Sequence, residues 1–251
     1  MLSLAGRVAL VTGGSRGIGR AVSVMLARVG AKVAVNYRTN EAAATETVEA
    51  VRAGGGTAVA LPGDVSRPEE ASRLVTETEA RLGPLDVLVV NHGIWLRASI
   101  ETMTPDQWEE TLRVNLRGAY AICHYAARVM IPRGRGAIVT IASTAGQRGE
   151  PYYAHYAASK GALLAFTKSL AAELAAHGIR VNAVSPGWVL TDMTRSTFTG
   201  PDAADALAAI PLGRPGTPEE IAGPVVFLAS DLASYLYGEV LSVNGGAVMA
   251  E

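Results

Sequence analysis

The side chains best suited to chemistry are Tyr156 and Lys160, four residues apart, and Ser143, a short loop upstream. In a helix this spacing puts the phenol and the ammonium on one face, one turn apart. A phenol titrates near pH ~10, and a fixed positive charge nearby is expected to lower that pKa towards the range of acid/base chemistry. The three residues predict proton transfer to or from an oxygen held by a serine hydroxyl. An amphipathic helix with a solvated lysine is the alternative for this spacing.

A glycine-rich turn provides the second motif. The apolar run Val8–Thr12 leads into Gly13, Gly17 and Gly19, and an apolar-periodic helix follows directly. Glycines let the backbone approach a ligand closely, and the N–H groups at a helix start attract phosphate. The spacing is a variant of the dinucleotide-binding turn. It therefore predicts a dinucleotide site, with a purely structural turn as the alternative.

The end of the second predicted strand bears on which dinucleotide is bound. A binder of the unphosphorylated cofactor typically has an acid here, whereas an arginine accommodates a 2′-phosphate. This chain has no acid between Val33 and Asn40, but it has Arg38, and Arg16 lies in the glycine turn. Two guanidinium groups can pair with a phosphate dianion. We therefore expect NADP(H) as the cofactor, with solvated surface arginines as the alternative.

The elements that must position these residues alternate along the whole chain. Short β-branched runs predict strands at Arg7–Thr12, Lys32–Tyr37, Thr57–Pro62, Val87–Val90, Ala137–Ile141, Val181–Ser185 and Val240–Val243. Helical periodicity predicts helices at Ile18–Val29, Glu41–Ala53, Pro68–Leu82, Pro105–Met130, Tyr153–Ala176 and Pro218–Ala229. Such alternation predicts an α/β, doubly wound fold with parallel strands and helices on both faces.

Local signals add detail to this pattern. Ser66 and Thr217 each precede a proline and acidic residues, which predicts two helix N-caps. The irregular segment Thr191–Gly216 is either a lid over a site or a plain surface excursion.

Bulk composition excludes several classes of function. The chain has 251 residues, 49% of them hydrophobic and 18% charged, so one large α/β domain is expected. A formal net charge of -1 gives no reason to expect nucleic acid or an anionic membrane as a partner. The single cysteine, Cys123, is expected to be a small buried hydrophobe, and the dispersed histidines predict no metal site. We see no signal peptide or membrane-spanning stretch and expect a cytoplasmic protein.

Several motifs occur together in a characteristic order. They are Thr12-Gly13-x3-Gly17-Ile18-Gly19, Asp64-Val65, Asn91-His92-Gly93, Asn115, Ser143, Tyr156-x3-Lys160 and Pro186-Gly187. Together they resemble the short-chain dehydrogenase/reductase family over essentially the whole chain. The resemblance implies a single Rossmann-type domain over residues 1–251, with a seven-stranded parallel sheet and no separate substrate domain. It also implies a homotetramer.

The resemblance also implies roles for individual residues. Asn115, Ser143, Tyr156 and Lys160 match a catalytic tetrad, in which Asn115 marks a helix distortion that positions a water next to Lys160. A solvent-facing asparagine is the alternative. The positions that match cofactor-binding residues are Gly13, Ser15, Arg16, Gly17, Ile18, Gly19, Tyr37, Arg38, Asp64, Val65, Asn91, Gly93, Tyr156, Lys160, Pro186, Gly187, Val189 and Thr191. His92 departs from the usual alanine, and we expect it to crowd the adenosine side or touch a neighbouring helix.

Within the family, the pattern looks most like the 3-oxoacyl-[acyl-carrier-protein] reductases. The basic loop Pro132–Gly136 fits an acidic acyl carrier protein as partner, whereas His177 stands where an arginine is common. Aromatic residues expected around the site would suit a smaller ketone, sugar or ring substrate. They are Trp95, Tyr152, Tyr153 and Trp188.

We therefore expect an NADPH-dependent carbonyl reductase that acts on a 3-oxoacyl thioester or a similar ketone. The alternatives are a sugar or secondary-alcohol dehydrogenase of the same family and, more remotely, a non-enzymatic nucleotide-binding sensor.

Overall fold

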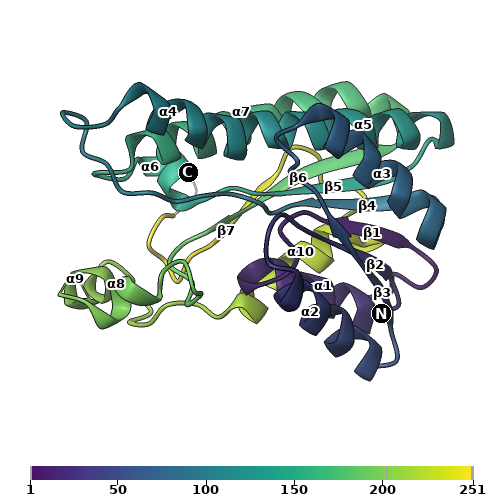
Figure 1. Cartoon of the computed structure of the whole chain (residues 1–251), viewed down its shortest axis with the longest axis horizontal. Helices are drawn as coiled ribbons and strands as arrows, with labels where there is room; N and C mark the ends of the chain where they lie inside the picture. Colours follow the sequence, from purple (N-terminus) through teal and green to yellow (C-terminus); the bar gives the residue numbers. More distant parts are fainter. Residues whose placement is uncertain (1, 202, 250–251) are drawn as a thin grey trace.

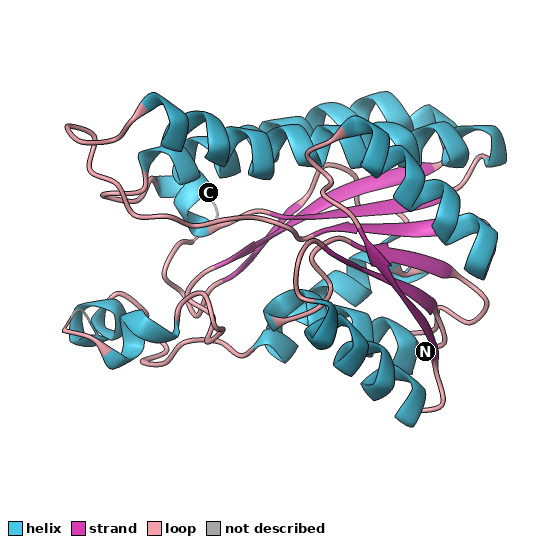
Figure 2. Ribbon diagram, in the orientation of Figure 1, coloured by secondary structure: helices cyan, strands magenta, loops and turns pink. Residues whose placement is uncertain are grey.

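Seven parallel strands form the centre of the molecule in the computed structural model, which describes residues 2–201 and 203–249 (Figures 1 and 2). The strands are β1 (Val8–Val11), β2 (Lys32–Tyr37), β3 (Thr57–Pro62), β4 (Leu85–Val90), β5 (Gly136–Ile141), β6 (Ile179–Pro186) and β7 (Val240–Val243). They lie in the order β3-β2-β1-β4-β5-β6-β7. The predicted seven-stranded parallel sheet is confirmed, although β4 and β6 each begin two residues before their predicted starts.

Helices cover both faces of this sheet (Figure 1). One face carries α1 (Gly17–Arg28), α2 (Glu41–Ala53) and α10 (Pro218–Ala229), and the other carries α3 (Pro68–Leu82), α5 (Gly118–Met130) and α7 (Ala154–Leu174). Neighbouring side chains of β1 point to opposite faces, so Val11 joins the apolar cluster on the α1 side and Leu10 joins the cluster on the α5 side. The doubly wound architecture is confirmed.

The predicted helix Pro105–Met130 is interrupted. It consists of α4 (Pro105–Leu112), a π-helical segment (Arg113–Arg117) and α5, and Asn115 is the central residue of the π-helical segment. There the N–H of Gly118 bonds back to the carbonyl of Arg113, five residues earlier. A continuous helix was the wrong prediction, and the distortion implied by Asn115 is confirmed.

Three short helices occupy segments that the sequence left irregular. They are α6 (Thr144–Arg148), α8 (Arg195–Thr199) and α9 (Ala203–Ala208). Helices of five or six residues are too short to show helical periodicity. The segment that carries α8 and α9 is tied at its base, because the N–H of Leu190 donates to the Gly216 carbonyl and the N–H of Gly216 donates to the Trp188 carbonyl, both at 2.9 Å.

The two predicted helix caps had different outcomes. Thr217 forms a capping box with Glu220, as expected. Ser66 does not cap α3, whose N-cap is Arg67. Instead the Ser66 hydroxyl donates to a carboxylate oxygen of Asp64 at 2.7 Å, and its oxygen accepts from the guanidinium of Arg113, which takes the place of the helix N–H groups.

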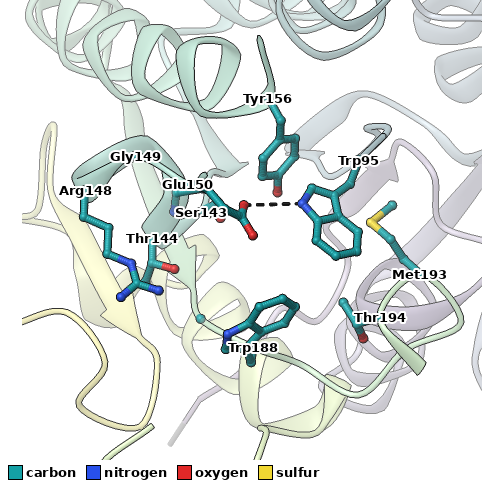
Figure 3. A pocket seen from close by; sticks show the side chains of 12 residues that line it. Trp95, Ser143, Thr144, Arg148, Gly149, Glu150, Tyr156, Trp188, Met193 and Thr194 are labelled. Atoms are coloured by element: carbon teal, nitrogen blue, oxygen red, sulfur yellow. Dashed lines mark hydrogen bonds between the residues drawn. The ribbon is translucent and has the colours of Figure 1, made fainter. Parts of the chain in front are cut away.

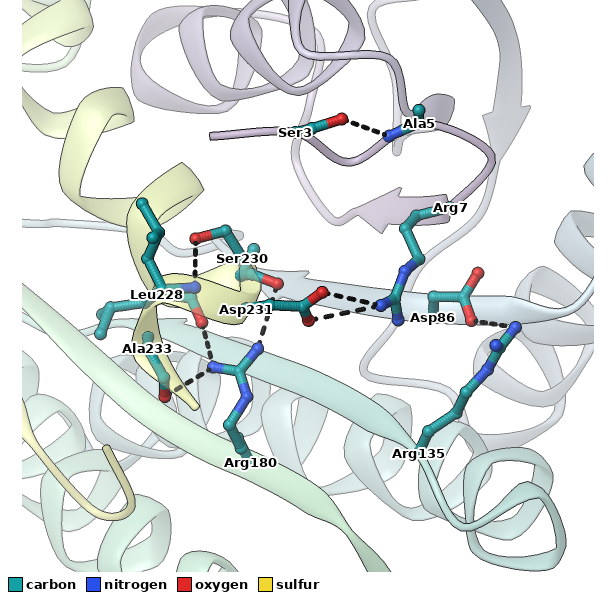
Figure 4. Close-up of polar contacts among 12 residues, drawn as sticks. Ser3, Ala5, Arg7, Asp86, Arg135, Arg180, Leu228, Ser230, Asp231 and Ala233 are labelled. Carbon is teal, nitrogen blue, oxygen red and sulfur yellow. Dashed lines mark hydrogen bonds and ion pairs between the residues drawn. The ribbon is translucent and has the colours of Figure 1, made fainter. Parts of the chain in front are cut away.

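Buried polar side chains tie the sheet to its surroundings at the edge where the strands begin (Figure 4). Arg180, in β6, donates to the carbonyls of Leu228, Ala229 and Ala233, which lie at the end of α10 and just after it. The carboxylate of Asp86 accepts from Arg133 at 2.6 Å and lies 3.1 Å from Arg135.

This network corrects the expectation for the basic loop Pro132–Gly136. The loop leads into the start of β5, whereas the candidate site lies beyond the carboxyl end of that strand. A strand of this length spans about 20 Å. Within one chain, therefore, the loop does not flank the site entrance, and its arginines neutralise Asp86.

Two further expectations concern single features. Cys123 is buried, and burial raises the pKa of its thiol to about 12, which confirms a small buried hydrophobe. Across residues 2–201 and 203–249, no helix has both the length and the apolarity to cross a bilayer.

Candidate active site

A cavity of about 470 Å³ opens at the carboxyl ends of β1 and β4, where the order of the strands reverses. Ligands of open α/β sheets bind at this type of switch point. The structure brings many of the predicted site residues together in its wall: Arg16, Gly17, Ile18, Asn91, Gly93, Ser143, Tyr156, Lys160, Pro186, Gly187, Val189 and Thr191.

The glycine turn forms one wall of this cavity. Gly13 and Gly17 adopt positive φ angles of 60° and 52°, which side chains rarely tolerate. A Cβ at Gly19 would lie 2.1 Å from the Gly13 carbonyl oxygen, so no larger residue fits there. Two asparagines hold the turn from either side, since Asn36 accepts from the Gly13 N–H and Asn91 donates to the Gly13 carbonyl.

The helix that follows presents a free N-terminus. The N-cap of α1 is Arg16, which makes no side-chain capping bond, and no acid occupies the first turn. The orphan N–H groups and the helix dipole favour an anion at this point. The exposed Arg16 adds a positive charge beside them. The chemistry of this end therefore fits a pyrophosphate.

A second hollow of about 390 Å³ lies at the end of β2 and contains Arg38 and Asp64 in its wall. Arg38 is exposed and, among the described residues, has no hydrogen bond or ion pair. Partial burial acts to raise the pKa of Asp64, but hydrogen bonds from Ser66 and the charge of Arg113 hold that pKa below its ordinary value. The charge of Arg38 contributes least to this lowering, so Asp64 stays ionised beside a cation that is coupled to it only through space.

Two residues predicted to bind cofactor lie elsewhere. Tyr37 is buried in the apolar cluster on the α1 side, and Val65 is buried in the cluster on the α5 side. Neither side chain lines the two hollows described above. Strand and turn position alone did not distinguish a side chain that faces the ligand from one that faces the core.

Tyr156 and Ser143 meet in the same cavity wall (Figure 3). Burial raises the pKa of Tyr156 to about 12, although its hydrogen bond with Ser143 acts in the opposite direction. The Lys160 ammonium lies 5.8 Å from the centre of the tyrosine ring and donates to the Ile141 carbonyl at 2.7 Å. We expected Lys160 to lower the pKa of Tyr156, and this prediction is wrong for the protein without cofactor. Desolvation of the buried phenol outweighs the effect of the distant ammonium charge. Burial also lowers the pKa of Lys160 to about 8.

Asn115 is buried just behind the cavity, which excludes the solvent-facing alternative. Its amide oxygen accepts from the Ile94 N–H at 2.8 Å, and its amide nitrogen donates to the Ile94 carbonyl at 3.0 Å and to the Ser159 hydroxyl at 3.1 Å. A Cβ at Gly93 would lie 3.3 Å from the Asn115 oxygen and 3.7 Å from the Lys160 ammonium. Asn115 thus fixes the loop after β4 against α7, the helix that carries Tyr156.

His92 touches a neighbouring helix, one of the two expected outcomes. Its Nδ1 lies 2.8 Å from the Thr12 hydroxyl, and a Cβ at Gly118 in α5 would lie 2.7 Å from its Nε2. Burial, followed by the charge of Lys160, lowers the pKa of His92 to about 3. The imidazole is therefore neutral at physiological pH and packs between β1 and α5.

A smaller pocket of about 70 Å³, here named the inner pocket, lies next to the phenol of Tyr156 (Figure 3). Its wall contains Trp95 and Trp188, which the sequence placed near the site, and Glu150, which it missed. Tyr152 was expected in this region but is half-exposed, and the guanidinium of Arg97 covers its ring at 4.5 Å from the ring centre. The signal that could have found Glu150 is its place in the loop between Ser143 and Tyr156.

Known proteins match this chain over nearly its whole length. A family model described as enoyl-(acyl carrier protein) reductase matches residues 13–248. A 3-oxoacyl-[acyl-carrier-protein] reductase from Synechocystis sp. is 40% identical over 99% of this chain and 100% of its own. An acetoacetyl-CoA reductase from Shinella zoogloeoides is 46% identical over 96% of this chain and 98% of its own. The chain belongs to the short-chain dehydrogenase/reductase family.

A solved structure agrees with this assignment. A Beutenbergia cavernae protein, described as an NAD(P)-dependent gluconate 5-dehydrogenase with NADP bound at low occupancy, superposes with a TM-score of 0.93 at 43% identity and covers 98% of both chains. As a short-chain dehydrogenase/reductase, the protein is an oxidoreductase that acts on CH–OH and C=O groups. Its relatives differ in substrate, so membership of the family leaves the substrate open.

Proposed function

We propose that the protein interconverts a ketone and a secondary alcohol, with NADP(H) as hydride carrier and with reduction as the favoured direction. One observation carries the proposal. The phenol of Tyr156 and the hydroxyl of Ser143 lie together in a cavity whose far wall is the glycine turn at the start of α1. An acid and a phosphate cradle in one cavity are the parts that a hydride transfer to a carbonyl requires.

Tyr156 acts as the acid in this proposal. NADPH, when bound, supplies the hydride to the carbonyl carbon. Because its pKa is raised to about 12, the phenol is protonated at neutral pH and can give its proton to the carbonyl oxygen. Ser143 donates a hydrogen bond to the same oxygen and stabilises the negative charge that develops there. Alcohol oxidation needs the phenolate instead, so its rate is expected to rise as the pH increases above neutrality.

Lys160 and Asn115 have supporting roles. Lys160 and Gly93 both line the cavity, and a Cβ atom added to Gly93 would lie 3.7 Å from the Lys160 ammonium. From this position Lys160 can donate hydrogen bonds to ribose hydroxyls of the cofactor. The three hydrogen bonds of Asn115 keep the π-helical segment and α7 in register around it. Asn115 is thus a positioning residue for Lys160 and Tyr156.

The phosphorylated cofactor is supported by charge. Arg16 beside the phosphate cradle and the free Arg38 beyond it suit the pyrophosphate and a 2′-phosphate respectively. No acid occupies the end of β2 to receive an unphosphorylated ribose. Cellular NADP pools favour reduction, which agrees with the acid form of Tyr156.

Two substrate classes follow from the relatives. A 3-oxoacyl thioester agrees with the two reductases that resemble this chain. Its acyl group would be carried either by acyl carrier protein or by coenzyme A. A neutral sugar or polyol agrees with an L-rhamnose 1-dehydrogenase from Sphingomonas sp., which is 40% identical over 98% of this chain, and a sugar acid agrees with the gluconate dehydrogenase structure. The polar contact of Glu150 in the inner pocket favours the second class, as developed below.

The segment 191–216 is proposed as a lid. Its first residues, from Thr191 to Thr194, line the cavity, and Phe198 in α8 packs edge-on against Trp188 at 5.6 Å. By similarity to the family, a homotetramer that buries α5, α7 and the C-terminal strand is also proposed. A cytoplasmic location stays a prediction.

Tyr156→Phe tests the chemistry, because it removes the acidic hydroxyl and keeps the ring. Turnover of carbonyl substrates with NADPH is expected to fall by about 10²- to 10⁴-fold, while quenching of intrinsic fluorescence by NADPH continues to report cofactor binding. Tyr125→Phe, the same change on α5 outside the cavity, is the control. Retention of more than about a tenth of the activity in Tyr156→Phe would contradict the proposed role.

A further inference from the structure

Glu150 is a carboxylate in the wall of the inner pocket, next to Tyr156 (Figure 3). It follows α6 in the loop that leads to α7, and its side chain is half-buried. One carboxylate oxygen accepts a hydrogen bond from the indole N–H of Trp95 at 3.3 Å. Within the described residues, this is the one hydrogen bond that the side chain makes. Most of its acceptor capacity is therefore free, since a carboxylate offers about four acceptor positions.

A structural ion pair does not explain this acid. Arg148 lies in the same pocket wall, yet in the described part of the chain no cation lies within 4 Å of the Glu150 carboxylate. Figure 3 shows the guanidinium of Arg148 directed towards Thr144 and away from the carboxylate. At a half-buried position water supplies the further donors when no ligand is bound, and a ligand that carries donors can replace this water without loss of hydrogen bonds. The pocket therefore suits a ligand that carries hydrogen-bond donors next to the phenol of Tyr156.

The aromatic residues around Glu150 hold it in place. Trp95 stacks on Tyr153 with ring centres 4.4 Å apart and planes 6° apart, and it meets Trp188 edge-on at 5.8 Å. Packing on two sides fixes the indole, so the N–H that holds Glu150 has a defined direction. The pocket thus combines flat apolar faces with an acceptor, an arrangement that suits the C–H faces and hydroxyl groups of a sugar ring.

The competing substrate class fits this pocket poorly. Near its reacting carbon, a 3-oxoacyl thioester carries two carbonyl oxygens and a sulfur, all of which lack a donor hydrogen. The ketone oxygen is held by Tyr156 and Ser143, so the thioester oxygen would face the carboxylate of Glu150 as a like partner. A volume of about 70 Å³ corresponds to about two waters at their liquid volume of about 30 Å³ each, which is enough for the hydroxyl groups on one edge of a substrate.

We infer that Glu150 is a substrate-binding residue that accepts hydrogen bonds from hydroxyl groups flanking the reacting carbon, and that the substrate is a neutral polyhydroxylated carbonyl compound of the sugar or polyol class. This inference rests on the proposed function, because it places the hydroxyl groups beside the carbon that Tyr156 serves. Trp95 acts as a positioning residue for the carboxylate. The acid thereby selects substrates by their hydroxyl groups.

The experiment compares hydroxylated and deoxygenated substrates on the intact protein. The hydroxylated set contains neutral aldopyranoses, hexitols and myo-inositol, and the deoxygenated set contains cyclohexanol and 2-butanol. Both sets are assayed by NADP reduction. The acetoacetyl thioester of N-acetylcysteamine is assayed by NADPH oxidation. The wild type is expected to show a kcat/KM at least about tenfold higher for one hydroxylated substrate than for its deoxygenated counterpart, since a bond to a charged acceptor is lost in the latter.

Variants then locate this preference. Glu150→Leu removes both acceptors and is expected to lower the ratio of kcat/KM for hydroxylated over deoxygenated substrate by about 10- to 100-fold, mainly through KM. Glu150→Gln keeps one acceptor and lowers the ratio by about fivefold. An effect of Glu150 on the proton transfer by Tyr156 would change kcat/KM for both substrates equally and therefore cancels in the ratio. Trp95→Phe keeps the stacked ring and loses the N–H, so it gives a smaller loss and serves as the second test if the Glu150 variants fold poorly. Glu101→Gln, the same change at an exposed position outside the pocket, leaves the ratio unchanged.

The outcomes separate the inference from the proposed function. An unchanged ratio in both Glu150 variants would overturn the inference and leave the proposed function standing. Turnover of the thioester or of the deoxygenated alcohols without turnover of any hydroxylated substrate would do the same. Absence of NADP(H) turnover with every substrate would overturn both. A ratio that falls in the Glu150 variants and stays constant in Glu101→Gln supports the inference.

Discussion

Arg38 offers the sharpest test of cofactor choice. Its guanidinium is exposed at the end of β2, lines the hollow of about 390 Å³ and has no hydrogen bond or ion pair within residues 2–201 and 203–249. It can therefore bind a 2′-phosphate without breaking an existing contact. Arg38→Gln removes the charge and the two-pronged donor, and it keeps a side chain of similar length and polarity.

The size of the effect follows from this exposure. A hydrogen bond between charged groups contributes about 1.5–3 kcal/mol. Solvent and salt reduce that value at an exposed site to about 1–2 kcal/mol. Since about 1.4 kcal/mol corresponds to a factor of ten, kcat/KM with NADPH is expected to fall by about 5- to 30-fold. With NADH, which has no 2′-phosphate, the change is expected to stay below about twofold.

The assay measures kcat/KM for both cofactors at one saturating carbonyl substrate. Arg81→Gln is the matched control, because it removes the same charge from an exposed position in the last turn of α3, away from the hollow. A loss in Arg38→Gln that is equal for NADPH and NADH would refute the assignment of Arg38 to the 2′-phosphate. Equal kcat/KM values for the two cofactors in the wild type would refute the preference for NADP(H) itself.

Three further predictions follow from the geometry. Gly19→Ala forces a methyl group against the Gly13 carbonyl and is expected to abolish NADPH binding and destabilise the fold by about 1–3 kcal/mol in urea unfolding. Gly54→Ala is the control, because Gly54 ends α2 with a φ of -82° and a Cβ there would lie 3.4 Å from its nearest neighbour, the Val51 carbonyl oxygen. It is expected to stabilise the fold by about 0.4–1 kcal/mol. Burial lowers the pKa of Lys160 to about 8, so folding carries the cost of a buried charge below that pH, and the cost fades as pH rises from 8 towards the unfolded value. Lys160→Met should therefore be more stable than the wild type at pH 7 and lose much of that advantage by pH 10, and a constant difference in unfolding free energy would count against the buried charge. If the segment 191–216 is a lid, NADPH should slow thermolysin cleavage between residues 195 and 209 by about fivefold or more, whereas an unchanged cleavage rate would indicate a plain surface excursion.

Local patterns in the sequence predicted most of the fold. β-Branched runs and helical periodicity each depend on neighbouring residues, so all seven strands and the main helices were predictable within about two residues. The glycine turn was also predictable, because its spacing reflects the backbone angles that it needs. The break in the long helix could be expected from Asn115 and the family resemblance, but not from periodicity, which continues on both sides of the π-helical segment.

Single side chains were harder to place than elements. Tyr37 and Val65 follow strands as cofactor-binding residues do, yet both point into the core. Tyr152 directly precedes Tyr153, which stacks on Trp95, but its own side chain is exposed and its backbone has a positive φ of 65°. In each case the direction of the side chain depends on packing against segments that are distant in sequence.

The sequence by itself determined the alternation of strands and helices, the phosphate cradle, and the presence of Ser143, Tyr156 and Lys160 at distances that suit one site. These features are local in the chain, so composition and spacing suffice to reveal them. Only the tertiary structure decided that burial raises the pKa of Tyr156 and that Arg133 neutralises Asp86 far from the site. It also decided that Glu150 meets Trp95, 55 residues away. Desolvation and long-range pairing depend on which segments fold together in space. No pattern of neighbouring residues along the chain shows which distant segments come into contact.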